Sequence, residues 1–312
     1  MAVVLGIDTS NYTTSCALYD TMSDTVIQKK RLLPVKQGEC GIRQSDAVFH
    51  HTQQLPVLMT ELFSEFEGKI DAVCASSVPR LQEGSYMPCF TVGTSTSQSV
   101  AAAMNVPVYF TSHQQGHIMA ALFSAKMLPL LSDRFIAFHV SGGTTEAILV
   151  TPDEDNIFKC EIVGKTLDLN AGQLIDRAGV MMGLQFPCGK EIERLASEYT
   201  DKVRVKPVIK GCDCCLSGFE NKLRDIFSES NDKVRTSAYA LAYVEATVSA
   251  MTERLFEKFG IMPVVFAGGV MSNSIIRKSL ESKLRCYFAE PEFSCDNAVG
   301  TAIVGSMKFH NN

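Results

Sequence analysis

The chain has 312 residues, of which 46% are hydrophobic and 20% charged, and this is the composition of a globular protein. Its length fits two domains of ordinary size better than one core, and it contains no run of about eighteen apolar residues, which argues against a membrane-spanning helix. A net charge of −5 argues against a protein whose whole surface binds nucleic acid, although a local basic patch remains compatible with it.

The first seven residues, MAVVLGI, lack the basic start of a signal peptide and predict a first strand. We therefore expect a cytoplasmic protein with no membrane partner. The eleven cysteines are scattered along the chain, so we expect most of them to be reduced. The sequence CDCC, with Cys212, Cys214 and Cys215, could bind zinc or a metal cluster. Because the usual CxxC pairing is absent, a thiol-rich loop is the favoured interpretation.

Three short strands are predicted at the start of the chain, in VVLGIDTS, SCALYD and TVIQKKRLL. Apolar residues at helical spacing then predict a helix over residues 44–65. A strand in IDAVCASS and a helix over residues 95–104 follow, and the segment PVYF precedes a helix that begins near His113. The first part of the chain is thus a β-meander followed by helices.

From Phe135 the same order begins again, with strands in FIAFHV, EAILV and FKCEIVG. Helices are expected near residues 171–183, 189–198 and 233–259, then a strand in VVFAGGV, a helix from Ser274 to Leu284 and a last helix after Asp296. Two copies of one pattern predict a duplicated α/β unit with a cleft between the copies. We expect an N-terminal lobe over residues 1–131 and a C-terminal lobe over residues 132–312, whose last helix, about 296–312, packs back on the N-terminal lobe.

His113 and His117 are four residues apart, and this spacing directs both imidazoles from one face of a helix. Thr111 and Ser112, just before them, are good residues for the start of that helix. Without the glutamate of HExxH, the pair by itself is read as two ordinary histidines more readily than as half of a metal site.

Four turns directly after predicted strands carry glycines, hydroxyls or acids: IDTSNYTTS, HVSGGTTE, FAGGVMSN and SCDNAVGTA. Each alone is compatible with an ordinary turn. Together, in a duplicated fold, one nucleotide bound in the cleft explains them better. Asp296 in the fourth turn can then join the two histidines, because two imidazoles and a carboxylate suit zinc or a transition metal.

With these residues assembled, the chain resembles the TsaD/Gcp/Kae family from Val4 to about Met307. The resemblance depends on the order of several motifs: GIDTS, HQQGH, VSGGTTE, DLNAGQLIDRAGVMMGLQFPCGKEIERLA, CLSGF, AGGVMSNSIIR and CDNAVGTA. It implies the duplicated α/β fold of actin, sugar kinases and Hsp70-type ATPases, with two lobes around a nucleotide cleft. It also implies transfer of a threonylcarbamoyl group to the tRNA adenosine 3′ of the anticodon.

The resemblance also assigns residues. It implies that His113, His117 and Asp296 bind one divalent metal, iron or zinc, on the phosphate side of an adenylate. The adenylate would be threonylcarbamoyl-AMP, or ATP or AMP. The family's substrate loop is similar to the turn of Val140, Ser141, Gly142, Gly143 and Thr144, and its sugar and base contacts to Asp176, Gly189, Glu193 and Asn273. The two carboxylates would otherwise be read as charges on helix surfaces.

The family works with companion proteins, so the resemblance implies TsaB-like and TsaE-like partners besides tRNA, while homo-oligomers are left open. Five residues stand where the family has acidic residues: Tyr12, Thr13, Gln115, Leu169 and Gln173. These departures predict that metal and nucleotide bind but that transfer to tRNA is slow or absent, even with companion proteins. The alternatives are a divergent paralogue that acts on another acceptor or as a non-catalytic nucleotide-binding subunit, and a small-molecule kinase of the same fold. A peptidase has no support, since HQQGH lacks the glutamate of HExxH.

Overall fold

The computed structural model describes residues 2–10, 12–34 and 42–311. The chain forms two compact units, each assembled from separate stretches of sequence. Unit 1 comprises Met1–Leu131, Thr151–Cys160 and Glu292–Asn312. Unit 2 comprises Ser132–Val150 and Glu161–Pro291.

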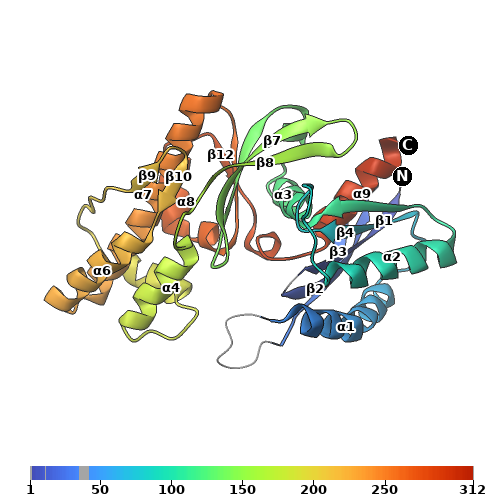
Figure 1. Ribbon diagram of the computed structural model, residues 1–312, viewed down its shortest axis with the longest axis horizontal. Coiled ribbons are helices and arrows are strands. Elements are labelled where there is room, and N and C mark those ends of the chain that lie inside the picture. The colour runs from blue at the N-terminus through green and yellow to red at the C-terminus, as the bar shows by residue number, and fades with distance from the viewer. Residues whose placement is uncertain (1, 11, 35–41, 312) are drawn as a thin grey trace. The chain divides into compact units, whose positions relative to one another are not determined.

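Unit 1 is built on a five-stranded mixed sheet in the order β3-β2-β1-β4-β5. Its strands are β1 (Val3–Ser10), β2 (Thr13–Asp20), β3 (Thr25–Leu32), β4 (Ala72–Val78) and β5 (Val108–Ser112). The first three pair antiparallel, and β1, β4 and β5 pair parallel. One face is covered by α1 (Gln44–Ser64) and α2 (Phe90–Met104), the other by α3 (His113–Ser124) and α9 (Val299–Asn311) (Figure 1).

The central strands of unit 1 are buried on both faces, which explains the apolar runs VVLGI in β1 and CALY in β2. Leu5 and Ile7 of β1 contribute to a core cluster that α1 joins through Leu55, Leu58 and Leu62. Those three leucines recur at intervals of three and four residues, so they lie on one face of α1. The helix is therefore held against the sheet by the pattern that predicted it.

Unit 2 repeats the arrangement with its sheet in the order β12-β11-β6-β7-β8. The strands are β6 (Phe135–Val140), β7 (Thr145–Asp153), β8 (Ile157–Lys165), β11 (Val264–Ala267) and β12 (Cys286–Phe288). The pairing is the same in the two units. The central strand, β1 or β6, pairs antiparallel with the next strand, β2 or β7. On its other side it pairs parallel with a later strand, β4 or β11. The predicted duplicated α/β fold is confirmed.

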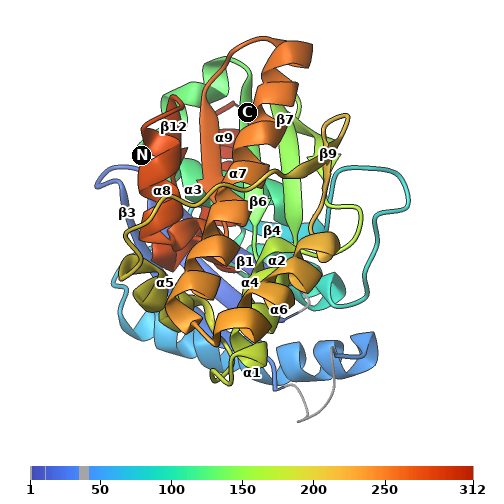
Figure 2. The same ribbon diagram turned by 90° about the vertical axis from the view of Figure 1, so that its left-hand side faces the viewer.

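The helices of unit 2 surround one long helix, α7 (Lys233–Phe259) (Figure 2). The others are α4 (Ala171–Met181), α5 (Gly189–Ser197), α6 (Ser217–Ser230) and α8 (Ser274–Glu281). A small hairpin joins β9 (Val208–Lys210) to β10 (Asp213–Cys215), and short 3-10 turns lie at Leu128–Ser132, Gly269–Ser272 and Pro291–Phe293. The largest core cluster of the protein belongs to this unit.

Most predicted helices and strands are present. The ends of two helices differ from the predicted residues. The helix predicted over residues 95–104 begins earlier, at Phe90, and the helix predicted from Ser274 to Leu284 ends at Glu281. The helix expected over residues 233–259 has those bounds. The prediction omitted α6 and the β9–β10 hairpin. Among the helices described, none combines the length and apolarity needed to cross a bilayer.

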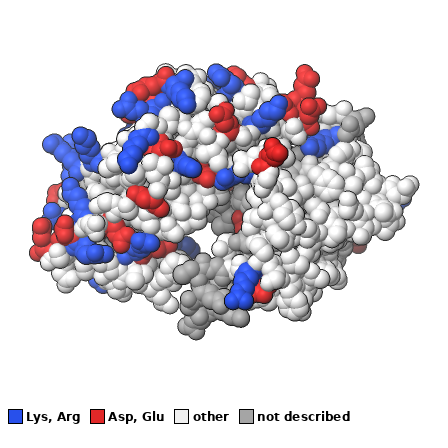
Figure 3. Space-filling model, viewed as in Figure 1, with Lys and Arg blue, Asp and Glu red and all other residues white. Residues whose placement is uncertain are grey.

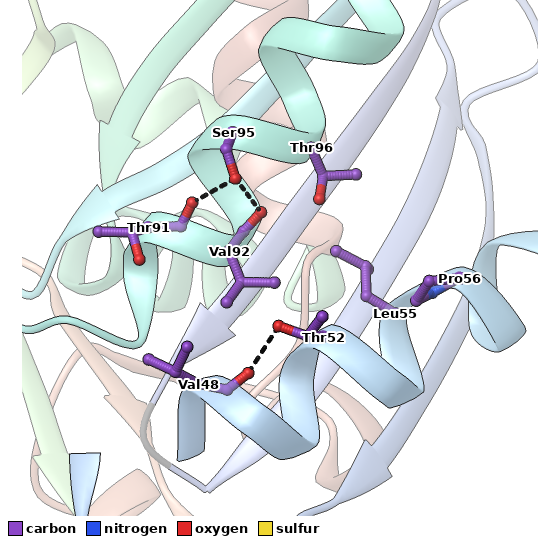
Figure 4. Close-up of a pocket in the computed structure, with 8 residues that line it drawn as sticks. All are labelled: Val48, Thr52, Leu55, Pro56, Thr91, Val92, Ser95 and Thr96. Carbon is purple, nitrogen blue, oxygen red and sulfur yellow. Dashed lines mark hydrogen bonds between the residues drawn. The ribbon is translucent and has the colours of Figure 1, made fainter. Parts of the chain in front are cut away.

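A cavity of about 430 Å³ lies between α1 and α2 of unit 1 (Figure 4). Apolar groups and hydroxyls line it: Val48, Thr52, Leu55, Pro56, Thr91, Val92, Ser95 and Thr96. The hydroxyls of Thr52 and Ser95 donate to carbonyls of their own helices. The lining contains no titratable side chain, so this cavity offers no acid, base or metal ligand.

On the other face of the sheet, α3 and α9 approach closely at two glycines. A methyl group added to Gly300 would overlap the carbonyl oxygen of Gly116 and lie 2.7 Å from the amide nitrogen of Ala120. A methyl group added to Gly116 would lie 3.0 Å from the hydroxyl of Thr301. Glycine at position 300 is therefore required by the distance between the two helices and not by its backbone conformation.

We predict that Gly300→Ala lowers the free energy of unfolding by about 1–3 kcal/mol, because the new methyl group must push α9 away from α3. Thermal and denaturant unfolding measure the change. Gly218→Ala is the matched control, since a methyl group at this exposed position of α6 would meet nothing within 4 Å. It should leave stability unchanged or raise it slightly. Equal stability of Gly300→Ala and the parent would contradict the proposed close contact.

Candidate metal centre and nucleotide-binding residues

The start of α3 is fixed by a local capping box. Ser112 accepts a hydrogen bond from the backbone amide of Gln115, and the Gln115 side chain accepts one from the amide of Ser112. Helix α3 therefore begins at His113, and His117 follows one turn later on the same face. Their rings are in edge contact, with centroids 4.4 Å apart.

His113, His117 and Asp296 bring three possible metal ligands together in unit 1, with one ligand atom of each within 4.8 Å of the others. The two Nε2 atoms are 3.0 Å apart, and Asp296 Oδ1 lies 3.1 Å from that of His117 and 3.6 Å from that of His113. Ligands about 2.0–2.2 Å from one ion at tetrahedral or octahedral angles would be separated by about 3.0–3.6 Å. The three side chains therefore fit one metal ion with positions left for further ligands.

Asp8, at the end of β1, lies directly behind His113. Its Oδ2 accepts a 2.8 Å hydrogen bond from His113 Nδ1, and its Oδ1 accepts one from the amide of Ser10. Burial alone would raise the pKa of Asp8, but the charge and hydrogen bond of His113 lower it below its ordinary value. An ionised Asp8 fixes the tautomer of His113 and directs Nε2 towards the site, as partners of metal-binding histidines commonly do. Asp8 was not among the residues predicted to form the site.

The same partner controls the charge of His113. Burial alone would lower the pKa of His113, but the charge and hydrogen bond of Asp8, with help from Asp296, raise it to about 9. Burial would likewise raise the pKa of Asp296, whereas the hydrogen bond of His117 and the charge of His113 hold it well below its ordinary range. Thr13 donates a 3.2 Å hydrogen bond to the other oxygen of Asp296. A metal ion would thus replace a proton that two carboxylates already attract.

Gln115 does not face this centre, contrary to the prediction that it replaces an acid there. Its side chain is buried, and besides the capping contacts its Nε2 donates to the carbonyls of Asn156 and Phe158. Leu169 is a core residue, and Gln173 completes the capping box of α4 with Asn170. Three of the five residues that differ from the family therefore serve helix capping or packing. The other two are Tyr12, which is exposed, and Thr13, which donates a hydrogen bond to Asp296.

The thiols of the CDCC sequence do not converge on a metal site. Cys214 lies in β10, is buried, and burial raises the pKa of its thiol to about 12. A thiol held in its neutral form is a poor metal ligand. Across the described part of the chain, His113, His117 and Asp296 are the one group of three such side chains with converging ligand atoms. The thiol-rich loop is the better interpretation.

The nine residues predicted to bind a nucleotide all belong to unit 2, and local contacts connect them. In the turn between β6 and β7, the hydroxyl of Ser141 accepts hydrogen bonds from the amides of Gly143 and Thr144. The carbonyl of Ser141 accepts one from the amide of Gly172, at the start of α4. A methyl group added to Gly142 or Gly143 would meet nothing within 4 Å, so this turn presents open backbone.

Asp176, Glu193 and Asn273 each commit one side-chain atom to a neighbouring helix start. Asp176 accepts from the amide of Cys188, before α5, and Glu193 accepts from the amide and hydroxyl of Ser274, at the start of α8. Asn273 accepts from two amides in the first turn of α8.

In the described residues no hydrogen bond is found to the second oxygen of Asp176 or Glu193, or from Nδ2 of Asn273. Each side chain therefore has one polar atom without a hydrogen-bond partner in this part of the chain. Gly189, the first residue of α5, also has open space beside it. The substrate-loop turn, α4, α5 and α8 are thus joined in one chain of contacts within unit 2.

A profile of the TsaD family, described as tRNA N6-adenosine threonylcarbamoyltransferase, matches residues 22–303. The chain belongs to the TsaD family. This match covers most of both units, including the three candidate metal ligands and all nine nucleotide-binding candidates. Membership associates the chain with tRNA modification and with group transfer as a class of activity.

Solved structures with a similar fold have much lower sequence identity. Component A of the (R)-2-hydroxyglutaryl-CoA dehydratase of Acidaminococcus fermentans is 17% identical, with 99% of each chain covered and a TM-score of 0.56. A ROK family glucokinase of Streptomyces griseus, solved with glucose and AMPPNP, is 10% identical over 98% of this chain and 99% of its own, with a TM-score of 0.54.

HypF of T. kodakarensis is 11% identical, with a TM-score of 0.59. The match covers 99% of this chain but 48% of HypF. At these identities the three likenesses establish the fold, which is the two-part α/β fold of sugar kinases and related proteins. They carry no information about the substrate.

We predict that metal affinity rises about tenfold per pH unit as the pH approaches about 9, because the ion must displace the proton of His113. The raised pKa has a second consequence with the opposite pH trend. The pair with Asp8 stabilises the metal-free fold fully below pH 6.5, and this contribution is lost as the pH rises through about 9. Metal competition with a chelator and unfolding at several pH values measure the two trends.

Asp8→Asn is expected to weaken metal binding about 10-fold to 100-fold and to flatten the pH dependence, because the amide cannot hold the charge of His113. His113→Ala should abolish metal retention while leaving the fold intact. Asp155→Asn, an exposed carboxylate of the same unit, is the control and should change neither property. Full metal content in His113→Ala by elemental analysis would show that these side chains do not form the site.

Proposed function

We propose that this protein transfers a threonylcarbamoyl group from threonylcarbamoyl-AMP to the N6 amine of the tRNA adenosine 3′ of the anticodon. The observation that carries the proposal is the family match over residues 22–303, together with the three-ligand centre that those residues form. In the reaction the amine attacks the carbamoyl carbonyl carbon and loses a proton. A new N–C bond forms, the bond from that carbon to the phosphate oxygen breaks, and AMP leaves.

His113, His117 and Asp296 would hold one divalent ion, with iron and zinc both compatible with two imidazoles and a carboxylate. When bound, the ion would supply a Lewis acid that stabilises negative charge on a phosphate. Asp8 would keep His113 in the tautomer that binds it. No covalent intermediate on the protein is required.

The residues of unit 2 would orient the adenylate. The open turn from Val140 to Thr144 suits an anionic or polar group that approaches the backbone. The remaining oxygens of Asp176 and Glu193 suit ribose hydroxyls, which donate hydrogen bonds, and Nδ2 of Asn273 suits an acceptor on the base. Orientation of the anhydride relative to an amine can account for a large part of the rate of such a transfer.

The alternative of a divergent, non-catalytic relative was based on the replaced acids, and the positions of three of these residues weaken that argument. Gln115, Leu169 and Gln173 serve capping and packing, so their lack of charge removes no acid from the metal centre. The similarity to a glucokinase concerns the fold alone, so it does not support the alternative of a small-molecule kinase. We therefore propose the tRNA transferase, assisted by TsaB-like and TsaE-like proteins.

We predict that Glu193→Ala and Asn273→Ala each weaken AMP binding by about 1–3 kcal/mol, since each leaves a polar atom of the nucleotide unpaired. Asn273→Ala should also lower stability by about 1 kcal/mol through loss of the α8 cap. Ser274→Ala is the control, because it removes the hydroxyl that contacts Glu193 and leaves the carboxylate in place. Calorimetry that finds unchanged affinity in both variants would reject this set of ligands.

The transfer itself is tested by incorporation of labelled threonine into unmodified tRNA, with companion proteins and an established member of the family assayed in parallel. We expect incorporation, lost in His117→Ala. The five sequence departures predicted slow transfer, and with three of them explained by packing, Thr13→Asp tests whether the remaining difference beside Asp296 limits the rate. No incorporation by the parent chain with intact metal and AMP binding would favour the non-catalytic alternative.

A further inference from the structure

The segment between α5 and β9 presents a row of cations that the proposed chemistry does not use. In the sequence DKVRVKPVIK, over residues 201–210, burial alternates residue by residue from Lys202 onwards. Val203, Val205 and Ile209 pack against the core of unit 2. Lys202, Arg204 and Lys206 are exposed. We call these three side chains the cationic row.

The alternation is typical of an extended chain that lies against an apolar surface, because successive side chains point to opposite sides. Figure 2 shows this segment, just before β9, crossing the front of unit 2. In an extended chain, side chains two residues apart are separated by about 6.7 Å. The valines therefore hold the three cations at a regular spacing along one line.

The cationic row is not neutralised by ion pairs. In the described residues, Lys202, Arg204 and Lys206 form no salt bridge, although exposed Asp201 precedes the row in the sequence. Of the acids in the preceding and following helices, Glu191 and Glu198 pair with Arg194, and Asp232 caps α7. Figure 3 shows Lys and Arg side chains along the left-hand edge of the view, mixed with acidic ones.

Lys210 continues the alternation but differs from the row. It lies opposite Asp213 in the β9–β10 hairpin, so its charge is partly offset. At the other end, half-buried Tyr199 precedes the row in the sequence and packs against the core of unit 2. Tyr199, three residues before Lys202, is in edge contact with Tyr239, and the guanidinium of Arg235 lies 5.7 Å from the centre of the Tyr239 ring.

We propose that the cationic row binds the sugar-phosphate backbone of an RNA strand. A strand of RNA offers one negative charge per nucleotide at regular intervals, which evenly spaced cations can match. An acidic protein would present charges at intervals set by its own sequence, so a regular row is less suited to it. The inference rests on the proposed function in one respect, because that function requires an RNA acceptor.

The test is RNA binding by the triple variant Lys202→Gln, Arg204→Gln and Lys206→Gln, measured by fluorescence anisotropy at several salt concentrations. The probes are an unmodified tRNA transcript and a single-stranded oligouridylate. We expect the variant to bind both at least about tenfold more weakly at low salt. The slope of log affinity against log salt should become shallower by about 2–3, since each lost phosphate contact contributes nearly one.

The matched control is the triple variant Arg194→Gln, Arg254→Gln and Arg277→Gln. It removes the same charge from the surface of unit 2, but at arginines that glutamates already neutralise. Its RNA affinity should stay within about twofold of the parent, and AMP binding and thermal stability should be unchanged in both triple variants.

Equal RNA binding by the parent and the row variant would overturn the inference, as would an equal loss in the control. Binding of polyglutamate that depends on the row, without a change in RNA binding, would assign the row to an acidic protein and also overturn it. Threonine transfer is assayed on the same samples. Row-dependent RNA binding without any transfer would reject the proposed function and leave the inference standing.

Discussion

The close contact between α3 and α9 is the constraint on which the candidate metal centre depends. Gly116 lies between the two histidines of α3, and Gly300 follows Asp296 by four residues. Their lack of side chains lets the helices approach until Asp296 Oδ1 is 3.1 Å from His117 Nε2. A wider spacing would separate the ligands without changing any of them. Packing, and not only the choice of ligands, therefore determines whether an ion can be held.

In unit 2 hydrogen bonds to helix starts, and not helix packing, position the candidate site residues. Asp176, Glu193 and Asn273 each use one atom to fix the start of a helix and have a second atom that the proposed nucleotide would contact. A side chain that is already held by the backbone loses little freedom when a ligand arrives, which favours affinity. The cost is that folding and binding depend on the same residues. Truncation of such a side chain affects both, and only isosteric changes separate them.

The sequence predicted the repeated strands and the histidine pair well, because both have local periodicity. Asp296 lies 179 residues from His117, so no spacing rule joins them, and the connection came from the ligand chemistry of the fourth turn and from the family resemblance. Asp8 was missed because an acid after a strand is common in ordinary turns. The position of Gln115 could have been read correctly: two residues from each histidine, it must face the opposite side of a helix.

The omission of α6 has a comparable physical cause. Its first turn has no capping side chain of its own. Instead Asp168 accepts hydrogen bonds from the amides of Leu216 and Ser217, 48 and 49 residues away. The signal that begins this helix is therefore absent from its own sequence. Nonlocal caps of this kind set a limit on what a window of sequence can show.

Unit 1 is completed by the last segment of the chain, and this has a consequence for biosynthesis. A ribosome releases residues in order, and Met1–Leu131 emerge long before Glu292–Asn312. Until then the sheet lacks the helix α9 that covers one face, and His113 and His117 lack Asp296. The nascent chain thus holds an uncovered apolar surface and an incomplete set of candidate ligands until this segment has been synthesised. The three candidate ligands can come together only after Asp296 has emerged.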